Sequence, residues 1–177
     1  EHIVNAAGLW AREVGAMAGV YLPLHPMEHQ YLITEDIPEF YERDEELPHV
    51  MDPEGESYLR QERQGLCIGF YEQRCDPWAV EGTPWTFGHE LLENKLERIS
   101  DSVEFAYRRF PILERAGVKT VINGPFTFAP DGNPLVGPVP GLRNYWSAVA
   151  VMAGFSQGGG VGLSLAEWMV EGEPSRD

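Results

Sequence analysis

The sequence predicts a mixed α/β (α+β) fold in which one domain is inserted into another. A strand followed by a helix is expected near each end of the chain, in residues 3–18 and 145–171. Between these two units the pattern changes to strands joined by short turns, which favours a mostly antiparallel sheet. We therefore expect residues 1–20 and 121–177 to build one domain, and residues 21–120 to form the inserted one.

The composition indicates a folded protein that binds neither nucleic acid nor an anionic membrane surface. Of its 177 residues 43% are hydrophobic, and 13 Lys and Arg stand against 28 Asp and Glu, a net charge of -15. A protein that binds nucleic acids or anionic lipids needs positive charge on its surface. The two cysteines, Cys67 and Cys75, lack the spacing of a zinc site and cannot form a disulfide framework. We expect no metal site and a reducing, cytoplasmic setting.

The first unit is a short buried strand over residues 3–7, followed by a helix over residues 9–18. Ala6, Ala7 and Gly8 lie at the turn between them, where small side chains allow the close approach of a ligand or a neighbouring backbone. This is half of a nucleotide-binding α/β unit, although an ordinary βα joint has the same pattern. Because the chain opens within this apolar strand, we expect it to be part of a longer protein.

The inserted part begins with a predicted strand over residues 24–34. His29 and Tyr31 lie on one face of this strand because side chains alternate along it. A single histidine on a strand is more often structural than catalytic. The acidic residues 36–48 are typical of a solvated loop or a short helix.

A β-hairpin is predicted next, with strands over residues 57–62 and 66–71 around Arg63-Gln64-Gly65. Tyr58 and Arg60 share one face of its first strand. The alternative to a functional role is that they form an exposed cross-strand pair. The longest helix is expected over residues 91–110, where apolar residues recur every three or four positions.

A strand over residues 118–128 and a turn at residues 129–134 lead to the last unit. That unit begins as an uncharged strand over residues 145–151 and ends as a helix stopped by Gly172. The joint between them, Gly154-Phe-Ser-Gln-Gly-Gly-Gly160, has almost no side-chain bulk. Such a joint lets something flat or anionic approach a helix N-terminus, and a tight packing joint is the alternative.

With these segments in order, the chain resembles the flavin-dependent amine oxidoreductases related to D-amino-acid oxidase. Within them it is most similar to the dimethylglycine and sarcosine dehydrogenase group. The matching segments are VNAAGLWAREVG, PMEHQYLIT, YLRQERQGLCIGFYE, NGPFTFAPDGNPLVGP, and NYWSAVAVMAGFSQGGGVG through EWMVEGEP. The family's G-x-G-x-x-G fingerprint for the FAD pyrophosphate is absent from the sequence.

The resemblance therefore implies the C-terminal half of the oxidoreductase unit, and it assigns the three predicted segments. Residues 1–20 and 121–177 would belong to the FAD-binding domain, and residues 21–120 to the inserted substrate domain. The N-terminal FAD-binding half would be the missing partner. Without it, we expect the chain to be inactive and unable to hold FAD.

The resemblance also implies roles for individual residues. Near the FAD it places a set of mostly small residues: Ala7, Gly8, Trp10, Ala153, Gly154, Phe155, Ser156 and Gln157. Near the substrate amine it places His29 and Tyr58, which would orient a neutral amine so that an N-methyl hydride faces flavin N5. An imidazole can take the proton of that amine. Arg60 is a candidate partner for the substrate carboxylate.

The implied activity is oxidation of an N-methyl amino acid, of the dimethylglycine or sarcosine type, by hydride transfer to FAD. In a fuller protein, tetrahydrofolate and an electron-transfer partner would take part. Two alternatives remain open at this point. One is another amine or amino-acid oxidase of the same superfamily, and the other is a flavin-free assembly subunit without catalytic activity.

Overall fold

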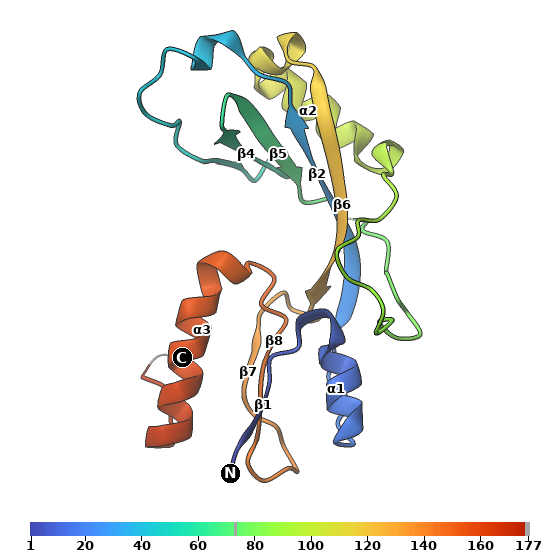
Figure 1. Ribbon diagram of the computed structural model, residues 1–177, viewed down its shortest axis with the longest axis vertical. Helices are drawn as coiled ribbons and strands as arrows, with labels where there is room; N and C mark the ends of the chain where they lie inside the picture. The colour runs from blue at the N-terminus through green and yellow to red at the C-terminus, as the bar shows by residue number, and fades with distance from the viewer. Residues whose placement is uncertain (73, 176–177) are drawn as a thin grey trace. The chain divides into compact units, whose positions relative to one another are not determined.

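The computed structural model describes residues 1–72 and 74–175 and divides the chain into two compact units (Figure 1). Unit 1 consists of Glu1–Met27, Pro77–Gly88 and Pro125–Asp177, and unit 2 of Glu28–Asp76 and His89–Gly124. The mixed α/β class is confirmed, since helices accompany a three-stranded and a five-stranded sheet. No helix in the described part of the chain is both long and apolar enough to cross a membrane.

Unit 1 is built on the three-stranded sheet, whose order is β1-β8-β7 (Figure 1). Strands β1 and β8 are parallel, and β7 pairs with β8 antiparallel. Its elements are β1 (Ile3–Asn5), the 3-10 helix η1 (Gly8–Trp10), α1 (Ala11–Met17), β7 (Leu135–Pro138), β8 (Tyr145–Val149) and α3 (Gly154–Glu171). Its core consists of small and aliphatic residues: Ala11, Leu22, Leu24, Ala129, Val149 and Ala150.

A buried asparagine holds the turn after β1. The Asn5 side-chain amide donates to the carbonyl oxygen of Ala11 at 2.9 Å and to the hydroxyl of Tyr145 at 3.2 Å. Its side-chain oxygen accepts from the N–H of Ala7 at 3.2 Å. Gly8 has a φ of 55°, and an added Cβ there would have no atom within 4 Å. The backbone conformation, rather than a close neighbour within this chain, therefore requires glycine at this position.

The glycine-rich segment lies inside the last helix and is not a joint before it, so this part of the prediction is wrong. Helix α3 begins at Gly154 and continues for 18 residues. Gly172 ends it in the left-handed conformation with a φ of 90°, as predicted. Only the later turns of α3 pack on the sheet: Leu165 is buried, and the Trp168 ring lies where a Cβ on Gly137 would otherwise be.

The five-stranded sheet has the order β3-β4-β5-β2-β6 and forms most of unit 2. Its strands are β2 (His25–Thr34), β3 (Val50–Asp52), β4 (Ser57–Glu62), β5 (Gly65–Phe70) and β6 (Val118–Phe128). The predicted hairpin is confirmed. Because Glu62 pairs with Gly65, the turn is the two residues Arg63 and Gln64, and Gly65 belongs to the second strand.

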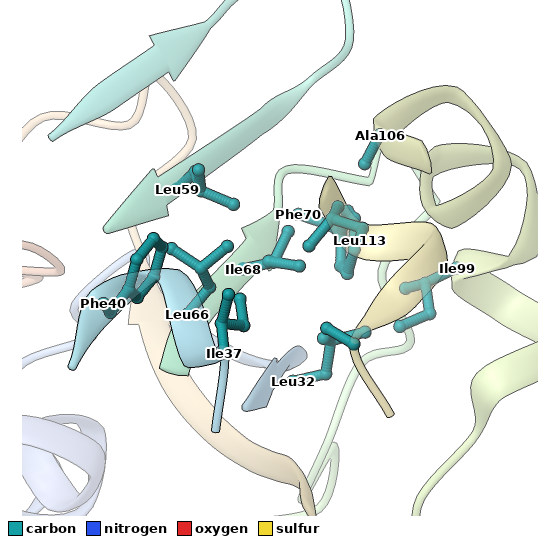
Figure 2. Packing of buried hydrophobic residues seen from close by; sticks show 11 residues of the cluster. Leu32, Ile37, Phe40, Leu59, Leu66, Ile68, Phe70, Ile99, Ala106 and Leu113 are labelled. Carbon is teal, nitrogen blue, oxygen red and sulfur yellow. The ribbon is translucent and has the colours of Figure 1, made fainter. Parts of the chain in front are cut away.

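One face of this sheet carries the core of unit 2 (Figure 2). Leu32, Ile68 and Phe70 pack with Ile99 and Leu113, which come from the helical segments. These segments are the 3-10 helices η2 (Pro38–Phe40), η3 (Leu96–Ile99) and η4 (Pro111–Arg115), and α2 (Ser100–Arg109). Alternation along the strands leaves the other face to a different set of side chains.

The helix predicted over residues 91–110 is shorter than expected, since residues 91–95 are not helical. The side chain of Gln30 forms hydrogen bonds with both backbone groups of Lys95. Its oxygen accepts from the Lys95 N–H at 2.7 Å, and its amide nitrogen donates to the Lys95 carbonyl oxygen at 3.0 Å. The N–H of Leu92 donates to the carbonyl oxygen of Asn123 at 2.9 Å. These backbone groups are therefore paired outside a helix.

Candidate functional site

The sheet register brings His29 and Tyr58 to one face of unit 2. Tyr31 pairs with Gly69, and Gly69 pairs with Tyr58, across β2, β5 and β4. Residues paired in this way point to the same side of a sheet, and His29 lies two residues before Tyr31. We call the side chains of His29, Tyr31, Tyr58 and Tyr71 the aromatic face.

Tyr71 joins the two predicted residues, although the sequence analysis did not select it. Its ring centroid lies 5.8 Å from that of His29 and 5.5 Å from that of Tyr58. Tyr71 is 48% exposed, whereas both ring nitrogens of His29 are buried. Its position two residues after Gly69 on the hairpin is the only signal in the sequence that points to this face.

Gly69 allows the Tyr58 ring to lie across β5. A Cβ on Gly69 would overlap the ring and hydroxyl of Tyr58. Burial raises the pKa of Tyr58 to about 12, and the neighbouring Cys67 and Tyr71 act in the same direction. The Tyr58 hydroxyl therefore stays protonated at neutral pH and can donate a hydrogen bond.

Arg60 lies two residues after Tyr58 on β4 and forms an ion pair with Glu62. Its side chain is 37% exposed. To bind a substrate carboxylate, as predicted, its guanidinium would exchange the Glu62 carboxylate for that of the substrate.

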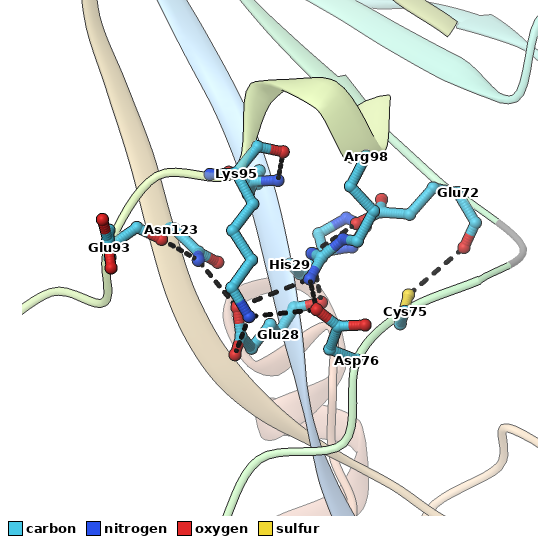
Figure 3. Close-up of polar contacts among 10 residues, drawn as sticks. Glu28, His29, Glu72, Cys75, Asp76, Glu93, Lys95, Arg98 and Asn123 are labelled. Carbon is cyan, nitrogen blue, oxygen red and sulfur yellow. Dashed lines mark hydrogen bonds and ion pairs between the residues drawn. The ribbon is translucent and has the colours of Figure 1, made fainter. Parts of the chain in front are cut away.

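A network of charged residues, missed by the sequence analysis, lies next to His29 (Figure 3). Arg98 contacts the Asp76 carboxylate at 3.0 Å and the Glu28 carboxylate at 3.4 Å. Lys95 reaches the same two carboxylates at 3.0 and 2.9 Å, and Asn123 donates to Glu28 at 2.9 Å. Burial alone would raise the pKa of Glu28, but its hydrogen bonds with Lys95 and Asn123 lower it overall.

Glu72 links this network to His29. One of its carboxylate oxygens accepts from Arg98 at 2.9 Å, and the other lies 3.3 Å from Nδ1 of His29. Burial opposes the charged form of Glu72, yet the contacts with His29 and Arg98 lower its pKa below the usual value. Glu72 is thus an ionised carboxylate held between a guanidinium and an imidazole.

The ligand atoms of His29, Glu72 and Cys75 lie within 4.8 Å of one another, a spacing that a metal site could also show. The charges here oppose a metal ion. Arg98 already places a positive charge on Glu72, and burial raises the pKa of the Cys75 thiol to about 11. A protonated thiol is a poor metal ligand.

The residues predicted near a flavin all lie in unit 1, one group after β1 and the other at the start of α3. Ala7 packs against the core, and the indole N–H of Trp10 donates to the carbonyl oxygen of Pro84 at 3.1 Å. The other group opens α3: Ala153 precedes the helix without a side-chain cap, and Gly154, Phe155, Ser156 and Gln157 are exposed.

The first turns of α3 fit a flat, anionic ligand such as FAD. A Cβ added to any of five glycines there would meet no atom within 4 Å: Gly154, Gly158, Gly159, Gly160 and Gly162. Glycine in a helix is less favourable than Ala by about 0.5–1 kcal/mol, and no contact within the described chain requires it. An exposed helix N-terminus therefore remains, in which Phe155 is the one aromatic side chain, and it favours negative charge.

Comparison with known proteins shows the family of the chain. Residues 1–168 match the family model for FAD dependent oxidoreductase, DAO. The chain is 48% identical over 180 residues to the mitochondrial dimethylglycine dehydrogenase of Mus musculus, covering 99% of this chain and 21% of that protein. It is 38% identical over 176 residues to the mitochondrial sarcosine dehydrogenase of Homo sapiens, covering 99% of this chain and 18% of that protein. The chain thus spans about a fifth of the length of these relatives.

Among solved structures, L-proline dehydrogenase from P. horikoshii matches with a TM-score of 0.77. The match covers 98% of this chain and 44% of that chain at 24% sequence identity, which shows a shared fold. Both curated relatives are mitochondrial by name, so the expected cytoplasmic setting gains no support from them.

Proposed function

The chain belongs to the DAO family of FAD-dependent oxidoreductases, and from this premise we propose that it forms part of an enzyme oxidising an N-methyl amino acid. The substrate is of the dimethylglycine or sarcosine type. The observation that carries the proposal is the aromatic face, where His29 and Tyr58 come together around Tyr71. The similarity to dimethylglycine dehydrogenase supports the choice of substrate class.

Unit 1 contributes to FAD binding through Ala7, Gly8, Trp10 and the start of α3 from Ala153 to Gln157. The pyrophosphate is held by a part of the whole protein outside this chain, because the sequence has no G-x-G-x-x-G fingerprint. When bound, FAD accepts the hydride at flavin N5. Residues 1–20 and 121–177 are the proposed FAD-domain portions, and residues 21–120 the substrate domain.

The residues of unit 2 bind the substrate and move its proton. An amine donates a hydride only in its neutral form, and His29 takes the proton of the substrate ammonium. Because the ring nitrogens of His29 are buried, Tyr71 turns aside to admit the amine, as a half-exposed side chain can do rapidly. The protonated hydroxyl of Tyr58 orients the substrate, and Arg60 pairs with its carboxylate.

The oxidised product is an iminium, which water hydrolyses to formaldehyde or whose one-carbon unit passes to tetrahydrofolate. Folate binding and transfer of electrons to a partner protein belong to the parts of the whole protein outside this chain. Both are proposed by analogy with the family alone.

Stopped-flow reduction of the flavin in the complete protein, with dimethylglycine and with sarcosine, tests this proposal. His29→Ala should slow reduction by about 10²-fold or more, since the proton acceptor is lost. Tyr58→Phe should raise the activation free energy of flavin reduction by roughly 1–3 kcal/mol, because the group that pairs with the hydroxyl loses its hydrogen bond. His49→Ala, at an exposed position, is the matched control.

Neither variant of the aromatic face should release FAD. Unchanged rates and pH profiles in both would move the active site away from this pair. Faster reduction by an amino acid without an N-methyl group would favour the alternative amino-acid oxidase. A complete protein without flavin absorbance would favour the assembly subunit.

A further inference from the structure

We propose that Glu72 is a positioning residue that fixes the proton of His29 on Nδ1, leaving Nε2 to accept the proton of the substrate amine. This inference rests on the proposed function, because it assigns a residue that acts through His29. Glu72 lies two residues after the end of β5 and was not selected by the sequence analysis.

The two carboxylate oxygens of Glu72 have different neighbours (Figure 3). Arg98 donates to one at 2.9 Å, and Nδ1 of His29 lies 3.3 Å from the other. The Glu72 side chain is 5% exposed and that of Arg98 is 11% exposed, so water does not compete for these contacts. The carboxylate is therefore fixed by a cation on one side and can orient the imidazole on the other.

Arg98 is itself held in place from several directions. It contacts Asp76 at 3.0 Å, and it donates to the carbonyl oxygen of Glu28 at 3.2 Å. The Gln30 side chain fixes the backbone of Lys95, three residues earlier, through two hydrogen bonds. The position of Glu72 is thus set by contacts that involve β2 and η3, in addition to its place in the chain after β5.

An ionised carboxylate only accepts hydrogen bonds, so the imidazole nitrogen facing it carries the proton. A neutral imidazole has one N–H, and its other nitrogen, Nε2, is then an acceptor. Tyr71 and Cys75 also border the His29 ring, while Tyr58 and Arg98 lie one contact further away. With pKa values of about 11 and 12, Cys75 and Tyr58 are neutral at pH 7. Glu72 supplies the negative charge next to Nδ1.

Glu72→Gln in the complete protein tests the inference. Arg98 requires an oxygen, so the new amide should turn its NH2 group toward Nδ1 of His29 and place the imidazole proton on Nε2. The rate of flavin reduction by dimethylglycine should fall by about 10²-fold, as with His29→Ala. The pH profile of the rate should also change, because the carboxylate beside Nδ1 is lost. Glu72→Asp, which keeps the charge, should recover part of the rate and the pH profile of the unmodified protein.

Glu104→Gln is the matched control, since Glu104 is 74% exposed and pairs with Arg108, outside this network. It should keep the pH profile. The double variant His29→Ala/Glu72→Gln should be no slower than His29→Ala, because Glu72 acts through His29. If Glu72→Gln does not fold, Glu72→Ala decides, and an unmodified rate and pH profile in that variant would overturn the inference.

The results separate this inference from the proposed function. A slow His29→Ala variant beside a Glu72→Gln variant with unmodified rate and pH profile would reject the role of Glu72 alone. Unmodified behaviour of His29→Ala would reject the proposed function itself.

Discussion

Single residues decide whether the aromatic face can form. Tyr58 lies over Gly69, and any larger residue at that position would push the ring out of the sheet face. Tyr71 contacts His29 on one side and Tyr58 on the other. The proposed substrate site therefore depends on a glycine that does not touch the substrate.

Gly69→Ala in the complete protein should displace Tyr58 and slow flavin reduction by dimethylglycine at least as much as Tyr58→Phe does. FAD content should stay unchanged, because no residue of the aromatic face is assigned to the cofactor. Gly124→Ala, in β6 of the same sheet, is the control, since a Cβ there meets no atom within 4 Å. Rates that are equal in both variants would contradict the arrangement of Tyr58 over Gly69.

The sequence could predict part of this site and not the rest, for a physical reason. Alternation along one strand placed His29 with Tyr31 and Tyr58 with Arg60, and the resemblance selected His29 and Tyr58. That His29 meets Tyr71 and Glu72 depends on the register between β2 and β5, which are far apart in the sequence. No periodicity within one strand carries that register.

At the scale of elements, the charged network ties β2, η3, β6 and the segment after β5 together. Glu28 and Glu72 have pKa values below the usual value of 4.5, which means that folding favours their ionised forms. A lowered pKa contributes stability that is present above the unfolded value and is lost as pH falls through the folded value. This network should therefore stabilise unit 2 at neutral pH and weaken below about pH 4.5.

Glu28→Gln should lower the free energy of unfolding at pH 7 by about 1–3 kcal/mol and reduce its dependence on pH in acid. Denaturant unfolding of the complete protein between pH 3 and 7 measures both effects. Glu54→Gln is the control, because Glu54 pairs with Arg109 at a side chain that is 76% exposed. An equal pH dependence in the two variants would contradict the assigned role of Glu28.

Helix α3 carries its glycines where its own chain does not need them. Gly158→Ala should therefore stabilise the isolated helix by about 0.5–1 kcal/mol. In the complete protein the same change should lower FAD content or the flavin reduction potential, because a Cβ would keep the ring away. Flavin titration and potentiometry of the variant measure this. Unchanged content and potential would show that the glycines do not face the cofactor.

The extents of these elements follow from the sequence where the local pattern governs them. The hairpin, the strand Val118–Phe128 and the end of α3 at Gly172 were predicted correctly. The helix over residues 91–110 was too long, because Gln30 and Asn123 pair with backbone groups before η3. Those contacts come from other strands and leave no trace in the apolar periodicity.

At the scale of the whole molecule, unit 1 exposes large apolar side chains. Ile3 is 62% exposed, Val170 is 78% exposed, and Phe155 is fully exposed at the start of α3. Single exposed apolar residues are common, but because they occur on both β1 and α3 we expect another part of the complete protein to cover these elements. The family match over about a fifth of the relatives' length agrees with this reading.

The 177-residue chain expressed alone should accordingly be poorly soluble and colourless. Co-expression with the N-terminal FAD-binding half should restore solubility and bound flavin. Absorbance spectra and thermal melts of both preparations measure this. A soluble, yellow product that melts cooperatively from the 177-residue chain alone would contradict it.

The central claim is that the complete protein transfers hydride from an N-methyl carbon of its substrate. The most direct test compares flavin reduction by dimethylglycine deuterated in its methyl groups with reduction by dimethylglycine deuterated in its methylene group. We expect a primary kinetic isotope effect from the methyl deuterium and a rate close to that of unlabelled substrate for methylene deuterium. A primary effect from the methylene deuterium alone would place bond cleavage at the α-carbon and contradict the claim.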